Sequence, residues 1–493
     1  MKAIMIMFDS LNRDYLECYG AALAKTPNFC RLARRSVIFE NCYAGSLPCM
    51  PARRELHTGR TNFLHRSWGP MEPFDLSMPE ILKEHGIHSH LASDHTHYWE
   101  DGGSTYHTRY STWEGFRGQE GDPWKGIAGE FPDRDPNLIQ HQGYRGKLYR
   151  QDNINRTYLE DERCHPQVRT FDAGLEFLEA NRDRDNWFLQ IETFDPHEPF
   201  FSYERFRKLY PHAYHGKRFD WPDYAPVQQS EEEIQEARYA YAALLSMCDE
   251  QLGKVLDRMD EYGLWKDTLL IVNTDHGYLL GEHGYWAKNY MPLYEEIVHT
   301  PLFIYDPRCG KQGERRKALV QTVDLPVTIL NFFGIQVPKR MTGQDLEDTV
   351  REDKKIRDGA LFGIHGAHVC VTDGRYVYMR APARKENQPL YEYTWMPARM
   401  TGFFSRQELM QAELKEGGRF TGELPVPRIP AQCGIPAFAY GNLLFDLTQD
   451  HGQEHPLEDP ETEARMCRLL TGLMKQEDAP AEQYERLGLL EYL

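Results

Sequence analysis

The sequence has no long uninterrupted apolar run and no surplus of basic residues. None of its apolar stretches is long enough to cross a bilayer. The 57 Lys and Arg residues are outnumbered by 75 Asp and Glu residues, which gives a formal net charge of −18. A negative field of this size argues against nucleic acid or an anionic membrane as a partner. An anionic substrate would therefore have to be held by a local cluster of basic side chains.

The cysteines lack the paired spacing of a disulfide framework or a zinc site. Ten of them are scattered from Cys18 to Cys467 without a Cys-x-x-Cys pair, which favours reduced thiols. The N-terminus also lacks the features of a signal peptide, because Lys2 leads into a short apolar run that reaches Asp9 without a small-residue cleavage site. We therefore expect a cytoplasmic protein, provided that this N-terminus is the natural one.

Length and composition predict a folded protein with more than one structural unit. At 493 residues the chain exceeds the usual size of a single domain. Its 27% charged and 12% aromatic residues are typical of a soluble globular protein. Residues 98–164 are rich in Gly, Trp, Tyr and charge but show little periodicity. Aromatic residues there are candidates for stacking on a sugar ring, although such residues more often only pack against their neighbours: Trp99, Tyr106, Trp113 and Trp124.

Short apolar runs followed at once by polar side chains recur along the chain. The runs read as buried strands of a mostly parallel sheet. In open α/β sheets, ligands bind beyond the carboxyl ends of the strands, so we expect the polar residues to share one site. The strands and the residues after them are Ala3–Phe8 with Asp9, His88–Ala92 with Asp94–His97, Trp187–Thr193 with His197, and Thr268–Thr274 with Asp275 and His276.

The stretch Ser46–Arg60 places Cys49 at or just before the start of a short predicted helix. Pro51 is tolerated in a first helical turn, and Gly59 lies where a helix usually ends. Free N–H groups at a helix start favour anionic groups. Arg53 follows Cys49 by one helical turn, so both side chains would face the same pocket. A buried structural cysteine beside a turn would fit this short pattern as well.

Asp9, Asp275 and His276 would together suit one divalent cation. Carboxylates favour calcium, magnesium or manganese, and an imidazole shifts the preference slightly towards the transition metals. The alternative is that Asp275 and His276 only cap a turn, with Lys288 in solvent. For His197, the alternative is a hydrogen-bonded loop histidine without a chemical role.

Several of these segments resemble one known family. Cys49-Met50-Pro51-Ala52-Arg53 matches the Cys-x-Pro-x-Arg signature of the formylglycine-dependent sulfatases, a branch of the alkaline phosphatase superfamily. Residues 275–288 resemble the second metal-binding motif of that family, and residues 444–450 resemble its C-terminal ending. The resemblance implies an alkaline-phosphatase-like α/β domain at 1–355, with its central sheet flanked by helices and an irregular insertion at about 98–164. A smaller α+β subdomain would follow at 356–493.

The resemblance also implies roles for the site residues. A maturation enzyme would oxidise Cys49 to formylglycine, whose hydrated aldehyde is the nucleophile that attacks sulfur. Arg53 would hold this group, His197 would protonate the leaving oxygen, and Lys288 would clamp the sulfate. The implied ligands of a single divalent metal, Ca²⁺ in preference to Mn²⁺ or Mg²⁺, are Asp9, Asp275, His276 and the residue derived from Cys49.

The sequence departs from the family pattern at two places. Ser10 stands where many sulfatases carry a second aspartate, which removes one carboxylate from the metal site. Asp94-His95-Thr96-His97 stands in place of a Gly-Lys-x-His motif. A protonated histidine would then replace the second cation that binds sulfate. His95 and His97 are both candidates for this role, and we favour His97.

The predicted activity is hydrolysis of an organic sulfate ester, with a carbohydrate sulfate and a small aryl or alkyl sulfate as the open substrate classes. A first alternative is a phosphonate monoester or phosphodiester hydrolase of the same superfamily, because those enzymes resemble this chain in lacking the second aspartate. A second alternative is a non-catalytic protein that binds an anion while Cys49 stays a thiol. Parallel assays with an aryl sulfate and an aryl phosphonate would separate the two hydrolases. Intact-mass analysis would show whether Cys49 is converted.

Overall fold

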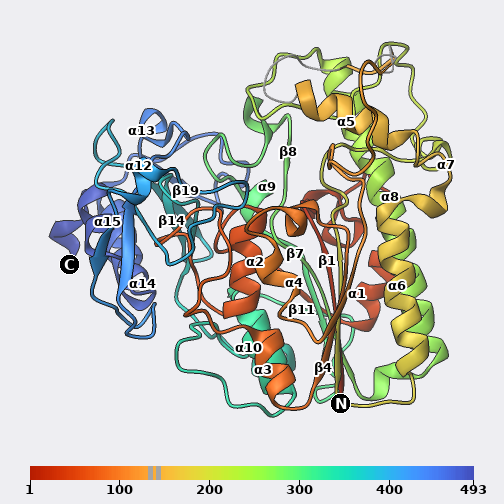
Figure 1. The fold of residues 1–493 in the computed structure, drawn as a ribbon, viewed down its shortest axis with the longest axis horizontal. Helices are drawn as coiled ribbons and strands as arrows, with labels where there is room; N and C mark the ends of the chain where they lie inside the picture. The colour runs from red at the N-terminus through yellow and green to blue at the C-terminus, as the bar shows by residue number, and fades with distance from the viewer. Residues whose placement is uncertain (132–136, 140–145) are drawn as a thin grey trace.

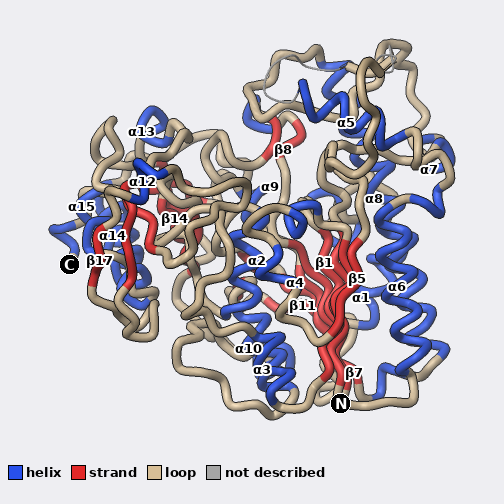
Figure 2. The backbone as a smooth tube through the Cα atoms, in the orientation of Figure 1, coloured by secondary structure: helices blue, strands red, loops and turns tan. Residues whose placement is uncertain are grey.

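The protein is described by a computed structural model that covers residues 1–131, 137–139 and 146–493. A mixed eight-stranded sheet runs through the larger part of the molecule (Figure 2), in the order β11-β2-β10-β7-β1-β6-β4-β5. Its strand pairs are parallel except where β10 lies antiparallel between β2 and β7. The predicted α/β class is therefore confirmed. The strands are β1 (Lys2–Phe8), β2 (Val37–Phe39), β4 (His88–Ser93), β5 (Thr112–Gly115), β6 (Trp187–Thr193), β7 (Thr268–Thr274), β10 (Leu302–Tyr305) and β11 (Glu314–Arg316).

Strand β1 is buried on both faces, because helices cover both sides of the sheet (Figure 1). Its even-numbered side chains Ile4, Ile6 and Phe8 pack in one apolar cluster with residues of α1, α6 and α8. The odd-numbered side chains pack in a second cluster with residues of α2, α3 and α10. This alternation explains why β1 reads as a continuous apolar run. The six helices are α1 (Pro27–Arg35), α6 (Pro166–Asn181), α8 (Glu231–Glu261), α2 (Cys49–Thr58), α3 (Met78–Glu84) and α10 (Asp324–Phe332).

The C-terminal region is built on a smaller antiparallel sheet with the order β13-β14-β15-β19. Helix α14 (Pro460–Gln476) covers one face of this sheet through a third apolar cluster. A three-stranded sheet with the order β16-β18-β17 is formed by the part of the sequence between β15 and β19. The proposed boundary after residue 355 stays a prediction. The strands are β13 (Ala360–Gly363), β14 (Val369–Thr372), β15 (Tyr376–Arg380), β19 (Leu443–Asp446), β16 (Tyr391–Tyr393), β17 (Glu413–Lys415) and β18 (Val426–Pro430).

The segment 98–164 holds more regular structure than its sequence suggests. Strand β5 extends the edge of the large sheet beside β4, and α5 (Gly146–Arg156) forms a three-turn helix. Residues 132–136 and 140–145 of this predicted insertion lie outside the described residues. Along the described chain, no helix is both long and apolar enough to span a membrane.

The remaining elements are short and join the layers. They are η1 (Arg13–Tyr15), η2 (Glu17–Tyr19), β3 (Cys42–Tyr43), η3 (Thr96–Trp99), α4 (Ser104–His107), η4 (Glu162–Cys164), α7 (Glu204–Arg207), η5 (Leu264–Lys266), β8 (Leu279–Leu280), η6 (Glu282–Gly284), β9 (Trp286–Ala287), α9 (Glu295–Val298), β12 (Val320–Gln321), α11 (Glu347–Glu352), α12 (Arg406–Leu409), α13 (Ala437–Tyr440), α15 (Ala481–Arg486) and η7 (Leu490–Tyr492).

Candidate active site

Cys49 is the first residue of helix α2, as the sequence predicts. The helix ends at Gly59, whose positive φ of 60° is a conformation that glycine adopts without strain. The chain just before the helix is fixed to the C-terminal region, because the N–H of Leu47 donates to the carbonyl of Gly363 in β13 at 3.0 Å. Both parts of the protein therefore help to position Cys49.

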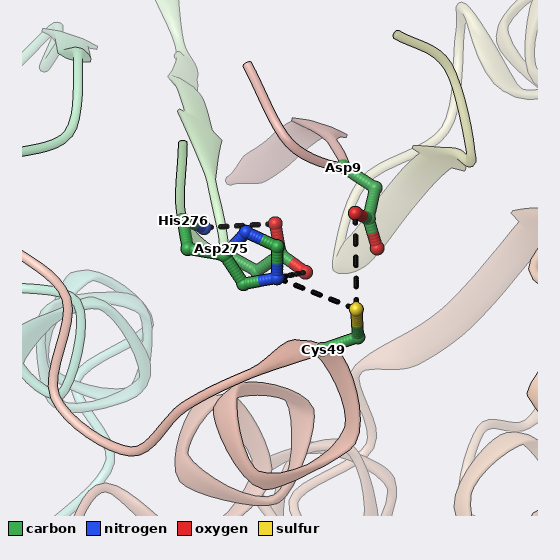
Figure 3. A group of neighbouring side chains, drawn as sticks. All are labelled: Asp9, Cys49, Asp275 and His276. Carbon is green, nitrogen blue, oxygen red and sulfur yellow. Dashed lines mark hydrogen bonds and ion pairs between the residues drawn. The ribbon is translucent and has the colours of Figure 1, made fainter. Parts of the chain in front are cut away.

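Asp9, Cys49, Asp275 and His276 form one buried cluster (Figure 3), with ligand atoms that all lie within 4.8 Å of one another. Cys49 Sγ lies 3.3 Å from His276 Nε2 and 3.9 Å from Asp9 Oδ1. The two aspartates meet because β1 and β7 are parallel neighbours in register, with their last residues paired. The predicted convergence of these four residues is thus what the structure displays.

Arg53 lies under this cluster and binds three buried carboxylates. Its guanidinium donates to Asp9 at 3.0 Å, to Asp275 at 2.8 Å and to Glu192 at 2.7 Å. It also donates to the carbonyl oxygen of Cys49 at 3.0 Å. Arg53 thereby ties the start of α2 to three strands of the sheet. Glu192 was not predicted, although a carboxylate inside the apolar strand β6 is a signal that the sequence does contain.

The carboxylates and the imidazole of the cluster differ in protonation. Burial raises the pKa of Asp9, but Lys288 and Arg53 outweigh it and hold this pKa well below its usual value. Burial and the charge of Asp9 raise the pKa of Asp275 to about 7. Burial and Lys288 lower the pKa of His276 to about 3, so the imidazole is neutral, as metal ligation requires. Burial and Asp9 raise the pKa of the Cys49 thiol well above its usual value.

Ser10 links Lys288 to the cluster. Its backbone has a positive φ of 61°, and its hydroxyl donates to Asp9 Oδ1 at 2.8 Å while accepting from Lys288 Nζ at 2.9 Å. Burial lowers the pKa of Lys288, but Cys49 and Asp9 more than offset this and raise it above its usual value. The position that carries a second aspartate in many sulfatases here holds a hydroxyl that orients a buried ammonium group.

The three predicted histidines differ in their hydrogen-bond partners. His197 Nδ1 is 2.6 Å from the carbonyl oxygen of Glu198, which leaves Nε2 for another partner, and burial lowers the pKa of its imidazole. His97 Nδ1 is 2.8 Å from Glu100 Oε2. His95 is buried, with Nδ1 3.9 Å from Asp9 Oδ2, and neither of its ring nitrogens has a hydrogen-bond partner among the described residues. Burial, Arg53 and His97 lower the pKa of His95 well below its usual value.

A cavity of about 370 Å³ opens above the cluster. Cys49, Lys288 and His197 line it together with His97, so four of the predicted site residues reach the same space. Residues from the loop after β16 also line it, which brings the C-terminal region to the site. The other described lining residues are Ser67, Trp68, Glu100, Glu120, Leu148, Tyr224, Asn289, Arg399, Met400 and Thr401.

The aromatic residues proposed for sugar stacking do not line this cavity within the described part of the chain. Tyr106 is fully buried and donates its hydroxyl hydrogen to the carbonyl of Gly69 at 2.7 Å. Trp99 and Trp113 pack edge to face on each other with centroids 6.0 Å apart, and Trp124 packs on Tyr158. The packing alternative therefore fits Tyr106 and Trp124, whereas Trp99 and Trp113 contact each other but stay exposed to solvent. Trp68 lines the cavity instead and has no sequence signal of its own.

The donor set of the cluster fits a divalent cation. Two carboxylates, one neutral imidazole and the position of Cys49 converge from three segments of the chain, and all four residues are buried. Hard oxygen ligands of this kind favour calcium, magnesium or manganese. The unpartnered ring of His95 beside Asp9 adds a further polar group to the same side of the cluster.

Comparison with known proteins identifies the family. Residues 2–335 match the family model described as Sulfatase, and residues 281–416 match the C-terminal model of N-sulphoglucosamine sulphohydrolase. An arylsulfatase of Clostridium perfringens is 24% identical over 399 residues, which cover 74% of this chain and 81% of that protein. Human iduronate 2-sulfatase is 25% identical over 405 residues, covering 69% of this chain and 70% of that protein.

Solved structures confirm the fold. The structure of BT4656 in complex with its substrate D-glucosamine-2-N,6-O-disulfate is similar with a TM-score of 0.66 at 16% identity, covering 97% of this chain and 98% of that chain. The phosphonate monoester hydrolase of Agrobacterium radiobacter also gives a TM-score of 0.66 at 16% identity, with coverages of 97% and 95%. The alkaline-phosphatase-like architecture is thus confirmed. Because the family match spans more than half of the sequence, the chain belongs to the sulfatase family, hydrolases that act on sulfate esters.

Proposed function

We propose that this protein hydrolyses an organic sulfate ester with a formylglycine derived from Cys49 and one divalent cation. The observation that carries the proposal is the place of Cys49, a buried residue that lines the cavity 3.3 Å from His276 and 3.9 Å from Asp9. Lys288 lines the same space. A nucleophile position, metal-type ligands and a fixed cation for sulfate are therefore within reach of one substrate group.

The metal would be held by Asp9, Asp275, His276 and the residue derived from Cys49. When bound, a divalent cation neutralises charge on the ester oxygens that develops during transfer. Calcium is our first choice, with manganese and magnesium as alternatives, because the set is dominated by carboxylate oxygens. Arg53 would keep both aspartates in place from the opposite side.

The remaining residues have roles that follow from their contacts. Conversion of Cys49 by a separate maturation enzyme supplies a hydrated aldehyde, whose two hydroxyl groups serve for attack on sulfur and for release of sulfate. Lys288, oriented by Ser10, would pair with a sulfate oxygen. His197 donates its Nδ1 hydrogen to the carbonyl oxygen of Glu198, so Nε2 can give a proton to the leaving oxygen only when the ring is protonated, a form that the charge of Glu198 favours.

Replacing His197 with alanine should slow the hydrolysis of sulfate esters with poor leaving groups far more than the hydrolysis of esters with good leaving groups. We expect kcat/KM for an alkyl sulfate to fall by about 10²–10⁴-fold, because an alkoxide needs a proton as the bond breaks. The value for 4-nitrophenyl sulfate should fall much less. His212→Ala, at a partly exposed histidine paired with Glu236, is the matched control. Equal losses on both substrates would contradict the role of His197 as a general acid.

Removal of divalent ions should lower both thermal stability and activity. Occupation of a site at about a hundredfold excess over its Kd stabilises a protein by about 2.7 kcal/mol, so chelation should lower Tm and calcium should restore it. Differential scanning fluorimetry measures the shift without substrate. Asp9→Asn should weaken the calcium-dependent shift, whereas Asp257→Asn, at an exposed aspartate, should retain it. A Tm that no divalent ion changes would exclude the proposed metal site.

Hydrolysis of a phosphonate monoester or phosphodiester is the second candidate function. The structural similarity to a phosphonate monoester hydrolase and the serine at position 10 both favour it. Parallel kcat/KM measurements with 4-nitrophenyl sulfate and a 4-nitrophenyl phosphonate decide between the two hydrolases. A protein with converted Cys49 that turns over neither ester would instead be an anion-binding protein.

A further inference from the structure

Glu192 is a buried carboxylate inside the apolar strand β6. Its side chain is fully buried, and it is not among the described residues that line the cavity. Burial of a charged group is costly unless other groups pair with it and donate hydrogen bonds to it. Any part that Glu192 takes in the chemistry must therefore pass through a residue that it contacts.

The two oxygens of Glu192 accept hydrogen bonds from different partners. Oε1 accepts from Arg53 Nε at 2.7 Å. Oε2 accepts from the hydroxyl of Tyr98 and from Nε2 of Gln190, both at 3.0 Å. Gln190 is itself held by the hydroxyl of Tyr110, which donates to its Oε1 at 2.6 Å. Because all of these residues are buried, a network of protein hydrogen bonds fixes the position of this carboxylate.

The contact with Glu192 fixes the orientation of the Arg53 guanidinium. A guanidinium is planar and its donors point in fixed directions, so a short bond at Nε determines where the two Nη groups lie. Nη1 donates to Asp275 at 2.8 Å, and Nη2 donates to Asp9 at 3.0 Å. These two carboxylates are the proposed oxygen ligands of the divalent cation. Glu192 therefore acts on both of them through one residue.

Glu192 also affects the charge that Asp9 and Asp275 present to a cation. Arg53 carries one positive charge that is shared among three carboxylates, and its bond to Glu192 is the shortest of the three. With a neutral side chain at position 192, the guanidinium charge would act on the two aspartates alone and would oppose a cation bound between them. Glu192 thus leaves Asp9 and Asp275 more negative charge for a metal ion.

We propose that Glu192 is a positioning residue that sets the affinity of Asp9 and Asp275 for their divalent cation. It holds Arg53 in the orientation that places the two aspartates, and it takes up part of the guanidinium charge. The inference rests on the proposed function for the presence of the cation. Residues one layer behind metal ligands typically change metal affinity by about 10–100-fold, whereas a carboxylate that only stabilised the fold would leave it unchanged.

Calcium titration of E192Q tests this role, because glutamine keeps the shape of the side chain and removes its charge. Isothermal titration of calcium into converted protein freed of divalent ions should give a Kd about 10–100-fold above the parent value. Hydrolysis of 4-nitrophenyl sulfate should need correspondingly more calcium, and most of the rate should return at saturating calcium. Y98F removes one hydrogen bond from Glu192 but leaves its charge, so it should change the Kd much less.

E72Q is the matched control. Glu72 is also a buried carboxylate paired with a buried arginine, Arg66, but it is not among the described residues that line the cavity. This variant should lose stability and keep the parent Kd for calcium. If E192Q does not fold, E192D shortens the side chain by one methylene group and should still raise the Kd, towards the lower end of the range of about 10–100-fold.

The possible results separate the inference from the proposed function. A Kd for calcium in the Glu192 variants equal to the parent value overturns the inference alone. A parent protein that binds no divalent ion overturns both the inference and the proposed metal site. Calcium binding that depends on Glu192, without hydrolysis of a sulfate ester by converted protein, would overturn only the proposed activity.

Discussion

Replacing Cys49 with alanine is expected to abolish sulfate release, with a fall in kcat of about 10⁴-fold or more. The thiol occupies the only position at which the start of α2, the two aspartates and His276 meet in the described structure. Cys49→Ser should be similarly inactive in steady state, because a serine hydroxyl offers no second hydroxyl for release of the product. Release of sulfate from 4-nitrophenyl sulfate under saturating substrate measures the effect.

The matched control is Cys164→Ala, which removes an exposed thiol that is not among the cavity residues. It should keep the parent activity and the parent Tm. A Cys49→Ala protein that is folded and retains turnover within about tenfold of the parent would contradict the assigned nucleophile position. Equal losses in both cysteine variants would point to a general requirement for thiols instead.

Arg53→Met should be the most destabilising substitution in the site, with a loss of about 3–5 kcal/mol in the free energy of unfolding. It removes one buried cation from three buried carboxylates, those of Asp9, Asp275 and Glu192. Chelator should increase the loss, since a bound cation would compensate Asp9 and Asp275. Urea unfolding with and without calcium measures both effects on stability. Activity should also fall, by about 10³-fold or more, because the residue derived from Cys49 loses its support.

The neighbouring arginine provides the control. Arg54 is also buried and binds Asp75 through two hydrogen bonds of 2.7 and 3.0 Å, but it does not line the cavity. Arg54→Met should lower stability while kcat/KM per folded molecule stays near the parent value. If Arg53→Met does not fold, Arg53→Lys keeps the charge and should retain stability better than activity. Full activity in either Arg53 variant would exclude the proposed support of the nucleophile.

The parts of the site that follow strands could be predicted from the sequence, because strand ends are fixed by the sheet. Asp9 and Asp275 follow apolar runs of similar length, and parallel pairing in register brings them together. Cys49 and Arg53 share one short helix, so their spacing alone places both on one face. These predictions depend only on local periodicity and on the rule that parallel strands end at one edge.

The outer part of the cavity could not be predicted, because it is assembled from loops that are distant in sequence. Trp68, Glu100, Glu120 and Arg399 meet there without any periodic pattern that would mark them. The irregular region drew attention to the wrong aromatic residues, since composition shows that rings are present but not which way they face. Glu192 is intermediate: its charge stands out in an apolar strand, but its partner Arg53 is known only from the fold.

Activity measured against the converted fraction of Cys49 tests the central claim most directly. Protein batches matured to different extents can be digested, and the mass of the Cys49 peptide gives the fraction that carries an aldehyde in each. We expect the rate of 4-nitrophenyl sulfate hydrolysis to rise in proportion to this fraction and to extrapolate to zero for the thiol form. Turnover that is independent of the fraction, or absent from fully converted calcium-loaded protein, would contradict this expectation.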